Sequence, residues 1–149
     1  MARIGFYHLT RTGAEAALPK LLGRVLAEGG RAMVLSPEAE RIAALDSALW
    51  VCGDPDWLPH GTPASGHAEL QPIWLTTEDG AAPNGARFLF LLDGAESAAL
   101  DAFDRVFDLF DGGDEQAVAA ARRRWAAAKA AGHELTYWKQ TARGWEKAA

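Results

Sequence analysis

The chain has 149 residues, 49% of them hydrophobic, and a formal net charge of −5 at pH 7. This length predicts one globular domain over residues 1–149, and the acidic balance argues against a nucleic-acid or anionic-membrane binder. No apolar run approaches the roughly 20 residues of a membrane span, Arg3 and His8 interrupt any signal peptide, and the single cysteine, Cys52, cannot form an internal disulfide. We therefore expect a soluble, cytoplasmic protein without a membrane partner.

The beginning of the chain predicts a strand followed by a helix. Ile4–Tyr7 is a short run that favours a strand. Apolar residues recur at helical spacing from Gly13 to Gly29. Because proline is tolerated only in the first turn of a regular helix, Pro19 makes the start uncertain, and the regular part is expected to begin near Leu18.

A second strand and helix follow. Ala32–Leu35 predicts a strand. Ser36 followed by Pro37 is typical of a helix start, and the helix is expected to reach Trp50. Residues 54–67 are rich in proline and glycine and predict a loop. The alternation of strands and helices favours an α/β fold.

The middle of the chain predicts a hairpin and a further helix. Ile73–Thr76 and Arg87–Leu92 are strand-like, and the Asn84-Gly85 pair between them tolerates a turn with positive φ. We expect an antiparallel hairpin at one side of the sheet. Apolar residues recur at helical intervals from Ala98 to Phe110, which predicts a helix.

The charge changes sign near the end of the chain. Asp114–Ala131 predicts an alanine-rich helix, and His133–Gln140 predicts a closing strand or an extended tail. Residues 1–118 carry 8 basic and 18 acidic side chains, a balance of −10, whereas residues 119–149 carry 7 and 2, a balance of +5. This segregation predicts one basic patch on an acidic body, suited to an acidic peptide.

Motifs for enzyme chemistry are missing from the sequence. The segment after the first strand has one glycine, Gly13, and no Gly-x-Gly, so neither a dinucleotide turn nor a Walker loop can be drawn. The histidines and Cys52 show none of the paired spacings of zinc sites. We assign no catalytic residue, no cofactor and no metal.

Two places combine aromatic and polar residues in ways that leave two interpretations open. Val118, Arg122, Trp125 and Lys129 lie along one helical stripe, which is either a packed tryptophan with a solvated rim or a binding surface. The loop containing Trp57 either packs onto the core or forms a protein–protein patch, since tryptophan is enriched at interface hot spots.

Several separated motifs occur together in this chain: Phe6-Tyr7, Leu45 to Trp50, Trp57-Leu58-Pro59-His60, Pro72-Ile73, Arg122-x-Arg124-Trp125 and Gly132-His133-x-Leu135-x-Tyr137-Trp138. Taken in this order, they resemble the chi subunit family of bacterial DNA polymerase III holoenzyme. The resemblance implies a single-domain, Rossmann-like, three-layer α/β fold with a mixed, mostly parallel sheet flanked by helices and no nucleotide chemistry. It also implies a non-catalytic adaptor of the clamp loader.

The resemblance further implies two protein partners and their sites. In the family, a helix with arginine and an aromatic residue captures the acidic C-terminal tail of the single-stranded-DNA-binding protein, and Arg122 and Trp125 match it. Arg123 and Lys129 are candidates to replace family lysines that this chain lacks. The psi subunit, or another clamp-loader component, is expected at the matching residues Trp50, Trp57, Pro59 and His60.

DNA contact is expected to be only indirect, and the protein to be a monomer alone or a heterodimer with psi. Two alternatives stay open. One is a nucleotide-binding enzyme on the same kind of fold, favoured by the strand and helix order at the start of the chain. The other is direct binding of single-stranded DNA by the arginines and tryptophans of the C-terminal segment.

Overall fold

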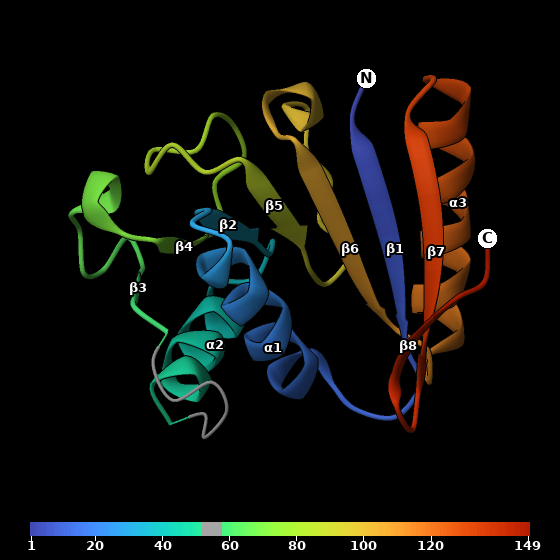
Figure 1. Cartoon of the computed structure of the whole chain (residues 1–149), viewed down its shortest axis with the longest axis horizontal. Helices are drawn as coiled ribbons and strands as arrows, with labels where there is room; N and C mark the ends of the chain where they lie inside the picture. The colour runs from blue at the N-terminus through green and yellow to red at the C-terminus, as the bar shows by residue number, and fades with distance from the viewer. Residues whose placement is uncertain (52–57) are drawn as a thin grey trace.

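A computed structural model describes residues 1–51 and 58–149 of the chain (Figure 1). Within these residues, eight strands form one sheet in the order β3-β4-β2-β5-β6-β1-β7-β8. Neighbouring strands are parallel except β7 and β8, which are antiparallel. The strands are β1 (Arg3–Leu9), β2 (Ala32–Leu35), β3 (His60–Gly61), β4 (Ile73–Thr76), β5 (Phe88–Leu91), β6 (Arg105–Asp111), β7 (Glu134–Thr141) and β8 (Gly144–Lys147).

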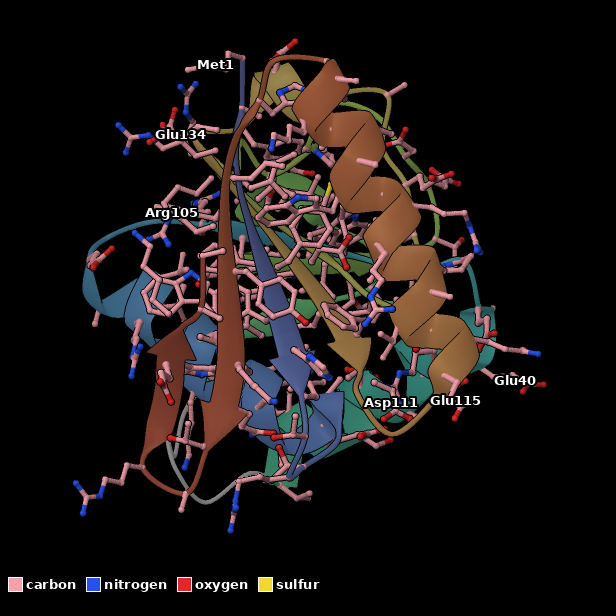
Figure 2. All side chains as sticks on the ribbon, turned by 90° about the vertical axis from the view of Figure 1, so that its right-hand side faces the viewer. Met1, Glu40, Arg105, Asp111, Glu115 and Glu134 are labelled. Carbon is pink, nitrogen blue, oxygen red and sulfur yellow. The ribbon has the colours of Figure 1, made fainter. Side chains whose placement is uncertain are left out.

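The sheet is covered by helices on both faces, which confirms the expected α/β fold. The helices are α1 (Ala14–Ala27), α2 (Ala39–Val51) and α3 (Glu115–Ala130), with short 3-10 turns at Ala68–Leu70 and Leu100–Ala102. Helices α1 and α2 pack on one face, and α3 packs on the other, over β6, β1 and β7 (Figures 1 and 2). In the described residues no helix is long and apolar enough to cross a membrane.

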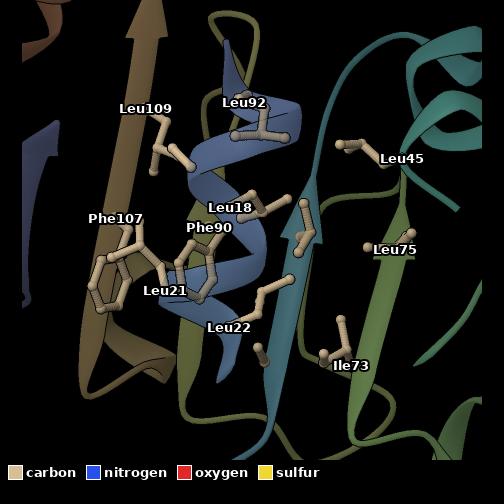
Figure 3. Packing of buried hydrophobic residues seen from close by; sticks show 14 of the residues in the cluster. Leu18, Leu21, Leu22, Leu45, Ile73, Leu75, Phe90, Leu92, Phe107 and Leu109 are labelled. Atoms are coloured by element: carbon tan, nitrogen blue, oxygen red, sulfur yellow. The ribbon is translucent and has the colours of Figure 1, made fainter. Parts of the chain in front are cut away.

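Each face of the sheet has its own hydrophobic core. Leu18 and Leu22 of α1 are fully buried and point at the central strands, where they meet Phe90 and Leu109 (Figure 3). On the α3 face, Phe6 of β1 packs with the strands and with α3. Because side chains alternate between the faces of a strand, the central strands are apolar in nearly every position.

The predicted antiparallel hairpin is wrong. β4 and β5 both run parallel to β2, which lies between them. Gly85 does adopt positive φ, at 71°, but the turn does not close a hairpin. The buried Asn84 side chain instead donates to the Ala32 and Gln71 carbonyls and accepts from the Ala86 amide, so it ties the connection to the start of β2.

The predicted helix from Ala98 to Phe110 is also wrong. Its first part is the turn Leu100–Ala102, and its second part is β6, a central strand. In β6, Val106 and Phe110 are buried toward α3 while Phe107 is buried toward α1. A strand that is buried on both faces places apolar residues at helical intervals too, so periodicity alone does not separate the two.

The other boundaries differ by smaller amounts. α1 begins at Ala14, earlier than expected, and contains Pro19. α2 begins at Ala39, after Pro37, because Glu38 supplies the carbonyl that accepts from Arg41 and Ile42. The expected loop over residues 54–67 contains the short strand β3 in its described part, and β8 was not predicted.

We predict that Asn84→Ala lowers the free energy of unfolding by about 1–3 kcal/mol, because buried carbonyls lose their donors. Chemical denaturation measures the change. Asn84→Asp is the matched control: it keeps the shape and replaces the donors by acceptors, so it should destabilise at least as much. An aspartate variant as stable as the parent chain would contradict the role given to the amide.

Candidate binding surface on helix α3

Helix α3 is defined at both ends by its sequence. The Asp114 carboxylate accepts from the Gln116 amide at 2.9 Å and the Ala117 amide at 3.4 Å, which caps the first turn. Gly132, with φ of 86°, follows the last turn, where a residue without a side chain is favoured. The helix and strand predicted for this part of the chain are therefore confirmed.

Trp125 lies at the border between core and surface. It is half-buried, and its ring packs edge-on against Phe6 at 5.3 Å and Tyr137 at 6.0 Å between centroids. Phe6 lies on β1 and Tyr137 on β7, so the indole anchors α3 across both strands. Trp125 is thus both packed against the core and partly accessible. It fits the packed-tryptophan interpretation and the binding-surface interpretation alike.

Arg124 is the member of the arginine run that faces the sheet. Its Nε and one terminal nitrogen donate to the two carboxylate oxygens of Asp108, at 2.7 and 2.9 Å. The side chains are 11% and 4% exposed, so the carboxylate is buried and the guanidinium is largely withdrawn from solvent. Burial raises the pKa of the Asp108 carboxyl, and the Arg124 guanidinium opposes that shift. Sequence reasoning missed this pair, because it placed Asp108 on a helix.

The predicted basic residues of α3 do not all lie together. Arg122 and Lys129 are exposed and share the flank of Trp125, since residues three and four apart lie on one side of a helix. Arg123 is also exposed but lies about 100° further round the axis. Among the described residues, Arg122 takes part in none of the ion pairs, so its charge is available to a ligand.

Polar groups of β1 and β7 adjoin Arg122. His8 Nδ1 lies 2.5 Å from the Tyr137 hydroxyl oxygen. Burial lowers the pKa of His8, and the charges of Lys139 and Arg122 lower it further. Burial raises the pKa of Tyr137, which Arg122 opposes. Neither His8 nor Tyr137 was a predicted site residue, although Tyr137 belongs to a motif that carries the family resemblance.

A cleft of about 620 Å³ opens at the carboxyl ends of β1 and β6, where α/β proteins usually hold their ligands. Its lining includes neither Arg122 nor Trp125. The ionisable side chains of the lining are mostly acidic. Arg41 in the cleft is ion-paired with Glu15 and Asp93. The ionisable side chains that line it are Glu15, Glu38, Arg41, Asp93, Asp111, Asp114 and Arg124.

Two backbone amides of the turn after β1 are occupied. The side-chain oxygen of Gln140 accepts from the Arg11 amide at 3.0 Å and the Thr12 amide at 3.1 Å. Nucleotide-binding folds use the amides at this position for phosphate. In this chain they hold the turn against β7.

The second predicted surface lies at the end of α2. Trp50 is 55% exposed and its ring lies 4.5 Å from that of His60. His60 is buried, and its ring nitrogens are hydrogen-bonded to the Leu58 carbonyl and the Asp46 carboxylate. These bonds join α2, which contains Asp46, to the residues just before β3. Pro59 is half-buried beside it. Trp57, the fourth residue predicted here, lies outside the described residues.

The fold and the surface define an α/β domain that presents a cationic, aromatic flank on its last helix. The chain belongs to the DNA polymerase III chi subunit family, HolC, whose family model matches residues 1–136. This assigns the chain to DNA polymerase III and to DNA replication. Comparison with curated proteins finds none that matches.

We predict that Asp108→Ala lowers the free energy of unfolding by about 3–5 kcal/mol, because it leaves the Arg124 cation buried without its partner. Denaturation with urea measures the loss. The double variant Asp108→Leu with Arg124→Met removes both charges and should regain most of the stability. If the double variant lost as much as the two single variants combined, the pair would not be the source of the effect.

Proposed function

We propose that this protein captures the acidic C-terminal tail of the single-stranded-DNA-binding protein on α3 and links it to the rest of the polymerase III holoenzyme as a non-catalytic adaptor. The observation that carries the proposal is the exposed Arg122, free of ion pairs in the described part of the chain, beside the half-buried Trp125. The family membership supports the replication context.

Electrostatics favours an acidic chain end at this position. A guanidinium can donate two parallel hydrogen bonds to one terminal carboxylate. Lys129 lies about two turns beyond Arg122 along the same flank, and Lys139 is exposed on the neighbouring strand. These cations would attract the aspartates that precede the chain end.

The aromatic groups beside Arg122 suit an apolar last residue. Trp125 and Tyr137 pack edge-on, and Phe110 lies next to both His8 and Tyr137. A ring can be stabilised here by stacking and by area removed from water. A few such anchors on a disordered tail correspond to roughly −6 to −8 kcal/mol, which is micromolar binding.

A second docking surface would link the protein to psi or to another clamp-loader component. The exposed Trp50, supported by His60 and Pro59, is the residue around which we propose that this contact forms. Tryptophan contributes strongly where it inserts into a partner. Trp50 and Arg122 lie on opposite faces of the sheet, on α2 and α3, so both partners could bind at once.

The two alternative functions meet specific obstacles. A nucleotide would have to place phosphates among the carboxylates of the strand-end cleft, where the Arg11 and Thr12 amides are already occupied. Direct binding of single-stranded DNA would rest on a basic flank within a chain of net charge −5. An anisotropy titration with an oligonucleotide and a thermal-shift screen with nucleotides test these alternatives.

We predict that Arg122→Ala weakens binding of an aspartate-rich peptide ending in Pro-Phe by about tenfold or more, since a hydrogen bond to a charged group contributes about 1.5–3 kcal/mol. Isothermal titration calorimetry measures the affinity. Arg123→Ala removes the same charge from a position about 100° further round the helix axis and should weaken binding far less. Equal losses in the two variants would show that only overall charge matters.

We predict that Trp50→Ala abolishes co-purification of clamp-loader components from the source cell's extract while peptide binding stays unchanged. The exposed indole supports little of the core, so the melting temperature should move little. Retained co-purification would exclude Trp50 as the centre of the second contact.

A further inference from the structure

His8 is fixed by groups from two other parts of the chain. Its Nδ1 is hydrogen-bonded to the Tyr137 hydroxyl on β7, and its Nε2 edge lies against Gly112, in the turn between β6 and α3. Gly112 lies so close that a β-carbon there would collide with the imidazole and with the Leu9 carbonyl. The imidazole is therefore held in one orientation, with Nε2 toward Gly112 and Nδ1 toward Tyr137.

The charges that face His8 are mostly positive. Burial lowers the pKa of His8, Lys139 on β7 and Arg122 on α3 lower it further, and a backbone hydrogen bond with Gly112 opposes the shift. The acidic side chains of the adjoining turn are Asp111, which accepts from the Gly113 amide, and Asp114, which caps α3. In the free protein, burial and these two cations favour the neutral form of His8, and a bound anion would offset the contribution of the cations.

We propose that His8 takes up one proton when a peptide carboxylate binds beside Arg122, and that the Tyr137 hydroxyl then donates its hydrogen to that carboxylate. This inference rests on the proposed function, because it concerns the same surface. It adds His8 and Tyr137 to the binding residues and makes binding depend on pH.

The hydrogen bonds that His8 and Tyr137 can form explain why protonation of His8 makes the Tyr137 hydroxyl hydrogen available to the ligand. In the neutral tautomer that carries its hydrogen on Nε2, which lies toward Gly112, His8 accepts at Nδ1 and the Tyr137 hydroxyl donates inward. Once Nδ1 carries a proton from solvent, it donates to the Tyr137 oxygen. The hydroxyl hydrogen is then free to turn toward the ligand, and no bond between heavy atoms changes.

Arg122 couples the ligand to the histidine. The same guanidinium that would hold the carboxylate disfavours the protonated imidazole in the free protein. A carboxylate paired with Arg122 cancels that repulsion, so ligand and proton stabilise each other. By linkage, affinity should rise as the pH falls through the range in which bound His8 is protonated and free His8 is not.

The test is titration calorimetry with the aspartate-rich peptide between about pH 6 and about pH 8, where peptide aspartates stay ionised. The parent protein should bind several-fold more weakly at the upper end, within the limit of about tenfold per pH unit for one proton. Repeating the titration in buffers of different ionisation enthalpy counts the protons taken up. His8→Gln should bind with an affinity that no longer changes with pH.

His67→Asn is the matched control, because His67 is exposed and its φ of 55° is a conformation that asparagine tolerates. It should keep the pH dependence. Nitrogen-15 spectra of the imidazole provide a second readout and should show the pKa of His8 rising when peptide is added. Tight binding without that rise, or with no proton uptake, overturns the inference and leaves the proposed function standing. Absence of binding at every pH overturns both.

Discussion

The buried ion pair between Arg124 and Asp108 is the interaction on which the binding surface depends. It joins the last long helix to a central strand through two hydrogen bonds of 2.7 and 2.9 Å. A bidentate pair fixes rotation as well as position, so it decides which residues of α3 face the sheet. With Arg124 inward on one flank and Trp125 packed on the other, Arg122 is left exposed beside β7.

The same geometry separates two electrostatic environments. On one side of α3 the strand-end cleft collects carboxylates, and on the other side Arg122, Lys129 and Lys139 form a cationic flank. The likeness to nucleotide-binding folds thus lies in the sheet and the helices that flank it. The turn after β1 is held by Gln140, whose side-chain oxygen accepts from the Arg11 and Thr12 amides.

The predictions made from the sequence succeeded where local pattern and tertiary packing agree. The ends of α3 follow from its aspartate cap and its terminal glycine, and β1 and β2 from short apolar runs. The errors concern the middle of the chain. The sequence of β6 predicts a helix because a strand that is buried on both faces can have the same apolar spacing as a helix. β4 and β5 were expected to pair with each other, but both pair with β2, which no local pattern reveals.

The candidate site was predicted only in part, because the sequence shows helical spacing but not strand pairing. Arg122, Trp125 and Lys129 follow from helical spacing, whereas Arg123 lies away from their flank. His8 and Tyr137 could not be found without the parallel pairing of β1 with β7, and Arg124 acquires its partner only once Asp108 lies on a strand.

Chemical-shift mapping with the aspartate-rich peptide tests the central claim most directly. The account predicts shifts clustered at Arg122, Trp125 and Tyr137; shifts confined to the strand-end cleft or to Trp50 and His60, or none at all, would contradict it.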